Sequence, residues 1–552
     1  MADHLASHLL LEQLAAEGTR FIFGSLSSAH SPLIAAALEV RSDIHYLAAL
    51  HEQIAGTMAI GYAQASGRPG VVSLPAATGL INGLSSLYVA KRGRIPLVVI
   101  ADQQDTRILN EEPPLSGDLC ELARPVAKWV CELRTPSEIP RQIRRAFHEA
   151  LSPPKGPVFI SAPVNILLAQ TPGSRVIAPP QTSPLGAAES TFLKKAAKAL
   201  VSAKRPCVIA GNEVSLYSAR KECVALVEVL GCPAFSEPLP TGVNFPNRHP
   251  QFAGVMPLDI HKASQLMSSF DVILLLGVQT RLPSNLGEPP LFPPESLVVQ
   301  LNVEAGLAGR TLPCDLTAIA DVTESLSRLR AEIQVIVDTN WVAAVKQRAN
   351  RSIAAIAKHR QEVEESITFP APNAPIPLIW LLRLLDAVRS QKSMVVSDVV
   401  CDFPNPFEIL CLENSSAYFS SNAGIGGYAL AAALGVQWSS PESSVVCLTS
   451  DESALCYPQA LWTASHYGLH VKFVIINNLG RANFSVQLAA IPNNPNRVLL
   501  DNPAIDLPEL ARSMRVPSAS VSTISALESS LQQMFETPGP YVLDVHIEDT
   551  LD

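Results

Sequence analysis

The sequence predicts an α/β protein with three successive domains, each built on a mostly parallel sheet. The chain has 552 residues, which is enough for several cores of ordinary size. Short β-rich runs alternate with helical patterns along most of its length, and proline-rich stretches interrupt that alternation. We place the domains at residues 1–180, 181–340 and 341–552.

The first domain opens with a helical pattern over residues 2–18 and then alternates strands and helices. This order is typical of βαβ units, which require parallel strands. Residues 167–184 (LLAQTPGSRVIAPPQTSP) are rich in Pro, Ser and Gln and predict a linker. The predicted strands are 20–24, 44–50, 70–74 and 95–101, and the predicted helices are 31–40, 52–66 and 79–92.

The second and third domains repeat the same alternation. In the second, strands are predicted at 205–211, 271–277 and 297–303, with helices at 190–203 and 218–231. A helical stretch at 341–366 and the proline-rich 369–377 lead into the third domain. There, strands are predicted at 393–398, 443–451, 471–478 and 540–547, with helices at 427–437 and 454–467.

Composition excludes several classes of function. The formal charge of −9 comes from 41 basic and 50 acidic residues without a block of like charges, so no nucleic-acid partner is expected. No apolar run approaches the roughly 18 residues that predict a membrane span. The ten cysteines form no CxxC pair, which favours reduced thiols and a cytoplasmic protein. Hydrophobic residues make up 47% of the chain, which favours an oligomer.

Polar residues follow two predicted strands of the third domain. Asp451 comes directly after one strand, and Asn478 ends the next one 27 residues later. A right-handed crossover brings both strand ends to one edge of the sheet. With the backbone carbonyl of Gly480, they form a hard oxygen set suited to Mg²⁺ and a phosphate. The structural alternative is that Asp451 caps a helix while Asn477 and Asn478 form a turn.

Residues 448–480 resemble the motif of the thiamine-diphosphate-dependent decarboxylase and acetohydroxyacid synthase superfamily, in which Gly-Asp-Gly precedes Asn-Asn. Four more segments resemble that superfamily in order, and benzoylformate decarboxylase is the most similar member. The segments are HEQIAGTMAIGYAQASGRPGVVSL, GPVFISAPVNI, SEPLPTGVNFPNRHPQFAGVMP and SSNAGIGGYALAAALGVQ. The resemblance implies a pyrimidine-binding domain, a central Rossmann-like domain and a diphosphate-binding domain.

The resemblance also implies a reaction, a set of cofactors and an assembly. It implies a lyase, either a decarboxylase or a carboligase, that acts on a 2-oxo acid or a 2-hydroxy ketone. Its cofactors would be thiamine diphosphate and Mg²⁺. The sites would lie between the chains of a homodimer or homotetramer.

Particular residues match the functional positions of the superfamily. Glu52 matches the glutamate that hydrogen-bonds the cofactor pyrimidine and promotes its imino tautomer, and Ser28 matches a substrate-side serine. The structural alternatives are a solvated or capping Glu52 and a helix cap at Ser28. The residues expected at the cofactor are Glu52, Gly424, Ile425, Gly426, Ser450, Asp451, Glu452 and Ser453, and those at the metal are Asp451, Asn478 and Gly480.

The sequence also departs from the superfamily at the diphosphate end. Ser450 and Glu452 replace the two glycines of the motif, and a carboxylate about 4 Å from the diphosphate would cost on the order of 4 kcal/mol. Val399–Asp402 offers few hydroxyls, and Gly426 replaces a bulky aliphatic residue. Pro75 replaces an active-site histidine of benzoylformate decarboxylase. A second hypothesis is therefore a relative with lost or altered cofactor binding, which serves as a non-catalytic partner or uses the cleft for another ligand or reaction.

Overall fold

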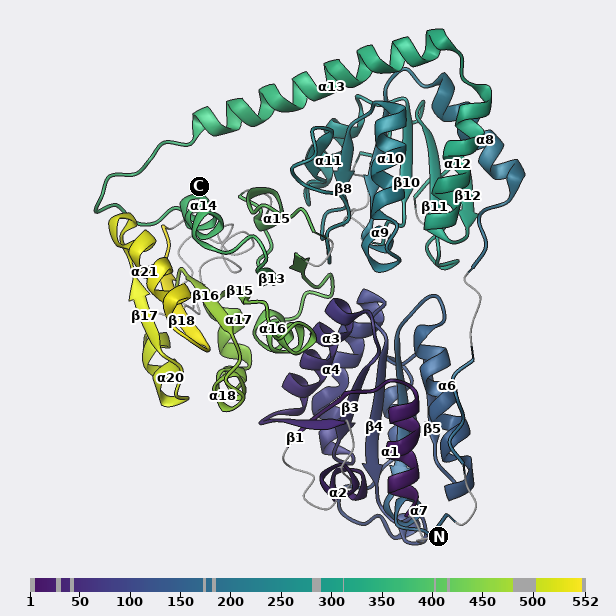
Figure 1. Cartoon of the computed structure of the whole chain (residues 1–552), viewed down its shortest axis with the longest axis vertical. Coiled ribbons are helices and arrows are strands. Elements are labelled where there is room, and N and C mark those ends of the chain that lie inside the picture. The colour runs from purple at the N-terminus through teal and green to yellow at the C-terminus, as the bar shows by residue number, and fades with distance from the viewer. Residues whose placement is uncertain are drawn as a thin grey trace. The chain divides into compact units, whose positions relative to one another are not determined.

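Three six-stranded sheets form the framework of the chain, and they confirm the predicted fold class (Figure 1). The computed structural model describes residues 5–25, 31–39, 44–171, 175–180, 185–279, 289–310, 312–401, 404–414, 417–479 and 503–548. The chain forms two compact units, one of Met1–Gln181, Lys392–Asp398 and Ala423–Asp552, the other of Thr182–Gln391 and Val399–Asn422. The boundaries predicted for three domains stay predictions.

The first sheet has the strand order β2-β1-β3-β4-β6-β5, and all its pairs are parallel. Its inner strands β3 and β6 are buried along their whole length, as expected where helices cover both faces. The strands are β1 Phe21–Ser25, β2 His45–Ala49, β3 Gly70–Leu74, β4 Leu97–Gln103, β5 Trp129–Glu132 and β6 Pro157–Pro163. The helices are α1 Ala6–Ala16, α2 Pro32–Glu39, α3 Glu52–Ser66, α4 Thr78–Gly93, α5 Leu119–Ala123, α6 Ile139–Leu151 and α7 Val164–Leu167.

The second sheet has the order β12-β11-β10-β7-β8-β9 and is also parallel. The strands are β7 Pro206–Ala210, β8 Ala234–Ser236, β9 Phe252–Val255, β10 Val272–Leu276, β11 Leu297–Asn302 and β12 Leu316–Ile319. The helices are α8 Ser190–Ser202, α9 Asn212–Leu216, α10 Arg220–Leu230, α11 Ile260–Met267 and α12 Val322–Ile336. The same unit contains α13 Thr339–Ser366, α14 Leu378–Val388 and α15 Pro406–Ile409.

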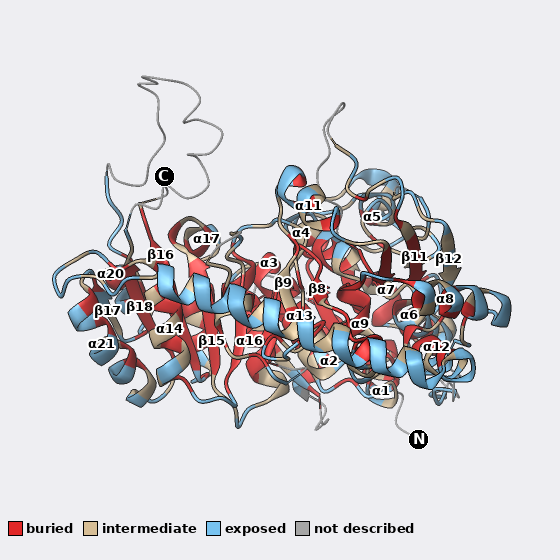
Figure 2. Ribbon diagram, turned by 90° about the horizontal axis from the view of Figure 1, so that it is seen from above, coloured by how far each residue is buried: buried red, intermediate tan, exposed pale blue. Residues whose placement is uncertain are grey.

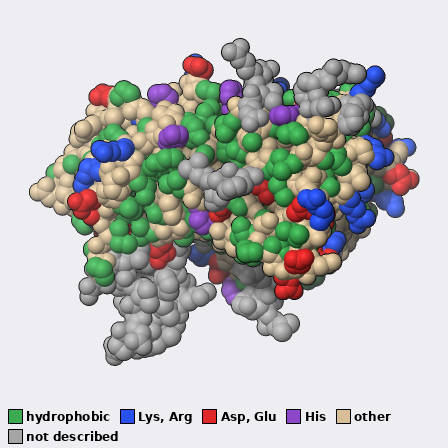
Figure 3. Space-filling view, turned by 90° about the horizontal axis from the view of Figure 1, so that it is seen from below, with side chains coloured by type: hydrophobic (Ala, Val, Ile, Leu, Met, Phe, Trp, Pro, Cys, Tyr) green, Lys and Arg blue, Asp and Glu red, His purple; other side chains and the backbone are tan. Residues whose placement is uncertain are grey.

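Strands are mostly buried in the structure, whereas the long helix α13 is mostly exposed (Figure 2). Val345 is its one buried residue. On the face drawn in Figure 3, basic side chains lie among acidic ones, and the described residues there form no continuous basic band. Within the described residues, none of the helices combines the length and apolar character needed to cross a membrane.

The third sheet has the order β14-β13-β15-β16-β18-β17. Its strands are β13 Met394–Ser397, β14 Tyr418–Phe419, β15 Val445–Ser450, β16 Val471–Asn477, β17 Ser518–Val521 and β18 Tyr541–His546. Its helices are α16 Tyr428–Ser439, α17 Asp451–Cys456, α18 Ala460–His466, α20 Leu507–Ser513 and α21 Ile524–Glu536. The single helix predicted at 454–467 is wrong: α17 begins earlier, because Ser450 caps it, and Pro458 lies between α17 and α18.

Helices α3 and α16 pack together very closely within one unit. A Cβ atom added to Gly435 would lie 1.8 Å from the carbonyl oxygen of Met58, and one added to Gly61 would lie 2.1 Å from that of Ala432. Glycine is therefore required on both helices at this crossing. Glu52 begins α3, so the crossing ties the N-terminal part of the chain to the helices around the third sheet.

Candidate active site

Glu52 is a buried carboxylate held by donors from two elements. Its side chain is only 7% exposed, although it occupies the first position of α3. Ser25 Oγ donates to Glu52 Oε1 at 2.9 Å, and Asn82 Nδ2 donates to Oε2 at 3.1 Å. The Glu52 carboxylate is therefore buried and hydrogen-bonded, which argues against the alternative of a solvated Glu52.

Neighbouring residues explain why Glu52 lies there. His51 caps α3, because its Nδ1 accepts a hydrogen bond from the backbone N–H of Gln53 at 3.1 Å. The helix therefore starts with Glu52 facing the ends of β1 and α4. The His51 ring also lies 5.4 Å from the ring of Tyr457, so the start of α3 is adjacent to the end of α17.

Asp451 and Asn478 lie at the carboxyl ends of two neighbouring parallel strands. Ser450 pairs with Ile476, so Asp451 and Asn478 follow at the same edge of the sheet. Asp451 is 3% exposed and Asn478 is 8% exposed. Asn477 instead accepts from the N–H of Leu479 at 3.1 Å and forms the turn. The arrangement expected for a metal-binding pair is therefore present, while Ser450 is the residue that caps α17.

The serine hydroxyls and the Asp451 carboxylate at the start of α17 have hydrogen-bond partners within the chain. Ser450 Oγ accepts from the N–H of Ser453 at 3.2 Å, and Asp451 Oδ1 accepts from the N–H of Glu452 at 2.9 Å. Ser453 Oγ accepts from the N–H of Gly427 at 2.7 Å and donates to Asp398 Oδ2 at 2.5 Å. An incoming phosphate would have to exchange with these contacts.

Asp398 places a further carboxyl group beside Ser453. Its Oδ2 also accepts from the N–H of Ala429 at 3.1 Å, whereas its Oδ1 is buried without a hydrogen-bond partner among the described residues. Burial raises the pKa of Asp398 above its usual range. A protonated Asp398 would carry no charge against a nearby anion.

The glycine-rich approach to α16 has its own geometry. Gly427 caps the helix with φ of +79°, and Gly424 has φ of +66°. A Cβ atom on Gly426 would lie 2.7 Å from Cys456 Sγ, so the thiol of α17 fills the space that a larger side chain would need. Ile425 lies between these glycines and is half-buried.

A histidine-carboxylate pair lies at the same sheet edge as Asn478. Asp544 of β18 accepts from Asn477 Nδ2 at 2.9 Å and lies 3.1 Å from His546 Nε2. The hydrogen bond to Asp544 raises the pKa of His546, and the charge of Asp451 acts in the same direction.

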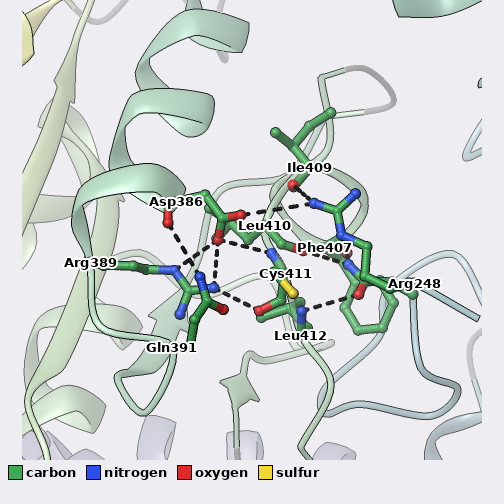
Figure 4. Close-up of polar contacts among 10 residues, drawn as sticks. Arg248, Asp386, Arg389, Gln391, Phe407, Ile409, Leu410, Cys411 and Leu412 are labelled. Atoms are coloured by element: carbon green, nitrogen blue, oxygen red, sulfur yellow. Dashed lines mark hydrogen bonds and ion pairs between the residues drawn. The ribbon is translucent and has the colours of Figure 1, made fainter. Parts of the chain in front are cut away.

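The segment after β13 is anchored within the other unit (Figure 4). Asp386 Oδ1 accepts from Arg389 Nη2 at 2.6 Å and from the N–H of Cys411 at 2.9 Å. Arg248 Nη2 donates to the carbonyl of Ile409 at 2.7 Å and lies 3.8 Å from Asp386 Oδ2. Arg248, in the segment FPNRHP, therefore holds the loop around α15.

Two glutamines at the end of β4 have structural contacts, and two predicted positions lie outside the described residues. Gln103 Nε2 donates to the carbonyl of Gly117 at 2.8 Å, and Gln104 Nε2 donates to that of Pro114 at 2.9 Å. These glutamines therefore hold the loop after β4. Ser28 and Gly480 lie outside the described residues.

Comparison with models of known protein families shows to which family the chain belongs. The N-terminal binding domain of thiamine pyrophosphate enzymes matches residues 5–120, the central domain matches 193–329, and the C-terminal binding domain matches 408–545. The chain belongs to the thiamine pyrophosphate enzyme family. The superfamily predicted from the sequence is confirmed.

Individual relatives of this family span nearly the whole chain. Benzoylformate decarboxylase of Pseudomonas aeruginosa is 27% identical over 546 residues, covering 98% of each chain. Acetolactate synthase isozyme 3 large subunit of Escherichia coli is 27% identical over 496 residues, covering 86% of this chain and 82% of the relative. A thiamine diphosphate-dependent 4-hydroxybenzoylformate decarboxylase of Rhodococcus jostii superimposes with a TM-score of 0.83 at 25% identity, covering 99% of both chains.

Thiamine diphosphate and a divalent metal, typically Mg²⁺, are the cofactors of this family. The Asp451 carboxylate and the Asn478 amide oxygen are ligands that Mg²⁺ prefers. The described residues contain no group of three or more His, Cys, Asp and Glu side chains that could hold a metal. The metal ligands expected from the sequence would not form such a group, because Asp451 is the only one of these residue types among them. The residues fit the cofactor at its metal and pyrimidine ends, while Ser450 and Ser453 must change partners at the phosphates.

Three residues of the site were not found by sequence reasoning: Ser25, Asn82 and Asp398. Ser25 and Asp398 each lie at the carboxyl end of a strand, where ligands of parallel sheets bind. That position was the available signal. Asn82 lies within α4 and is an exposed residue, so nothing in its local sequence indicates a contact with Glu52.

Proposed function

We propose that this thiamine pyrophosphate enzyme is a Mg²⁺-dependent lyase that decarboxylates a 2-oxo acid or joins or cleaves a 2-hydroxy ketone. The observation that carries the proposal is that the chain supplies residues suited to both the pyrimidine end and the metal end of the cofactor. Glu52 is buried and held by two donors, and Asp451 and Asn478 lie at adjacent strand ends. The names of the relatives support a decarboxylase or a synthase of this kind.

Each residue has a defined task in this proposal. Asp451, Asn478 and the carbonyl of Gly480 would bind the metal, and Glu52 would hold the proton shared with the pyrimidine ring. Gly424, Ile425 and Gly426 would line the approach to the cofactor, with Ser450 and Ser453 near its phosphates. When bound, the cofactor supplies a nucleophilic carbon and an electron sink for the electrons released with CO₂. Ser28 would contact the substrate.

The proposed assembly is a homodimer or homotetramer in the cytoplasm. Its sites would lie between subunits, and the domains would divide near residues 180 and 340. The high apolar content of the chain, with 47% hydrophobic residues, supports extensive subunit contacts.

A second candidate is a family member with altered or lost cofactor binding. It is favoured by the contacts of Ser450 and Ser453 within the chain and by Glu452 on the first turn of α17. Such a protein would act as a non-catalytic partner or use the cleft for another ligand.

An activity screen separates the two candidates. The purified protein is incubated with thiamine diphosphate, Mg²⁺ and a panel of aliphatic and aromatic 2-oxo acids, including benzoylformate, and of 2-hydroxy ketones. CO₂ release and the formation or consumption of 2-hydroxy ketone are measured. The first candidate predicts turnover in at least one of these assays that depends on both cofactors and is lost in Glu52→Gln. Cofactor binding without turnover of any 2-oxo acid or 2-hydroxy ketone would favour the second.

A further inference from the structure

Ser25 makes a contact with Glu52 that the proposed reaction does not by itself require. Its hydroxyl donates to Glu52 Oε1 at 2.9 Å, and Ser25 is only 1% exposed. A buried hydroxyl aimed at a buried carboxylate is a costly arrangement unless the two satisfy each other.

The backbone around Ser25 fixes where this hydroxyl points. Ser25 is the last residue of β1 and pairs with Ala49 of β2, three residues before Glu52. Tyr46 donates its hydroxyl to the carbonyl of Ser25 at 3.0 Å. A Cβ atom on Gly24 would lie 2.0 Å from the Tyr46 hydroxyl oxygen, so Tyr46 lies across a glycine that leaves it room. The strand end is therefore held by β2, through strand pairing and through the Tyr46 side chain.

Among the described residues, two donors reach different oxygen atoms of Glu52 from different elements. Ser25 of β1 reaches Oε1, and Asn82 of α4 reaches Oε2. Two donors on opposite oxygens fix the plane of a carboxylate as well as its position. Hydrogen bonds to a carboxylate also favour its ionised form. A carboxylate held in this way would present one fixed direction for the hydrogen bond between Glu52 and the pyrimidine ring of a bound cofactor.

We propose that Ser25 is a positioning residue that sets the orientation and charge of the Glu52 carboxylate toward the pyrimidine ring. The proposal rests on the proposed function, because it concerns how the same site activates its cofactor. Ser25 acts only through Glu52 and does not itself touch the reacting atoms.

The test measures exchange of the thiazolium C2 proton of thiamine diphosphate for deuterium, by rapid quench and proton NMR, at saturating cofactor and Mg²⁺. This measurement needs no substrate. Calorimetry gives cofactor affinity and thermal unfolding gives stability for the same samples. The variants are Ser25→Ala and Ser25→Cys, where cysteine keeps the size of serine but is a weak donor. The control is Ser73→Ala, a buried serine of β3 in register with Gly24.

We expect both Ser25 variants to slow the exchange about tenfold, the loss typical of one hydrogen bond to a charged group. Cofactor affinity and melting temperature should stay close to the wild-type values, and Ser73→Ala should exchange at the wild-type rate. A merely structural serine would change stability and affinity but not the rate at saturation. If Ser25→Ala does not fold, Ser25→Cys decides.

Two results would overturn the inference, and they are distinguishable. Wild-type exchange rates in the Ser25 variants would remove the role of Ser25 and leave the proposed function intact. A wild-type protein that neither binds thiamine diphosphate nor promotes exchange would remove the proposed function and the inference together.

Discussion

Glu452 lies half-buried on the first turn of α17, between Asp451 and Ser453. Both neighbours are expected at the cofactor, and a carboxylate near a diphosphate is repulsive. The variant Glu452→Gln keeps the length of the side chain and removes its charge. We expect it to bind thiamine diphosphate about tenfold more tightly at low salt, measured by calorimetry. The matched control is Glu442→Gln, an exposed glutamate before β15; equal affinity in both variants would show that Glu452 points away from the phosphates.

Residues whose role follows from a motif could be predicted from the sequence, whereas their partners could not. Glu52, Asp451 and Asn478 were predicted, and the structure buries all three. Ser25 and Asp398 were missed because their roles depend on which side chain lies opposite, which local sequence does not contain. The structural alternative from the sequence made Asp451 the helix cap, whereas the structure assigns the cap of α17 to Ser450.

Buried Glu213 provides a prediction about stability in the central region. Burial raises its pKa from the usual 4.5 to about 7, although it accepts hydrogen bonds from the N–H of Val303 and from Asn302. Between these pH values the folded chain holds a proton that the unfolded chain has lost. Stability should therefore fall as pH rises from about 4.5 through about 7.

Glu213→Gln should remove that part of the slope. Thermal unfolding at several pH values in this range measures it, with the exposed Glu324→Gln as the control. Asp102, with a pKa raised to about 6, contributes equally to all three proteins. The same pH slope in Glu213→Gln and wild type would contradict the account.

The crossing of α3 and α16 joins the helix that carries Glu52 to the helices around the sheet that carries Asp451 and Asn478 within one chain. Gly435→Ala would place a Cβ atom 1.8 Å from the Met58 carbonyl, so the helices must separate. We expect a loss of stability of about 1–3 kcal/mol and weaker cofactor binding, measured by denaturant unfolding and calorimetry. Gly117→Ala, where nothing lies within 4 Å of the added atom, should behave as wild type. Equal effects of both substitutions would contradict this reading of the crossing.

The strands and helices that could be predicted from the sequence are those whose local pattern matches their surroundings in the fold. Inner strands such as β3, β10 and β16 were predicted because strands covered on both faces are continuous apolar runs. Most strands that were missed are short strands at sheet edges: β5, β9, β12, β14 and β17. All of them except the buried β14 are partly exposed. A single helix was predicted at 454–467 because the helical periodicity continues across Pro458. The structure instead divides this segment into α17 and α18.

At the scale of the whole molecule, the proposal places each site between two chains. Glu52→Gln and Asp451→Asn should each abolish activity alone, because each removes one end of every site. Mixed dimers of the two variants would contain one site with both wild-type ends. Statistical mixing in a symmetric dimer should then restore about a quarter of wild-type activity. Activity is measured after dissociating and reassociating the mixture, and no recovery would contradict a site shared between chains.

The central claim is that this chain binds thiamine diphosphate through Mg²⁺ despite its altered motif. Calorimetric titration of the metal-free protein with the cofactor, with and without Mg²⁺, tests it most directly. The account predicts one cofactor per chain, binding that requires Mg²⁺, a rise in melting temperature, and loss of all three in Asp451→Asn. No heat and no thermal shift at millimolar cofactor would contradict it.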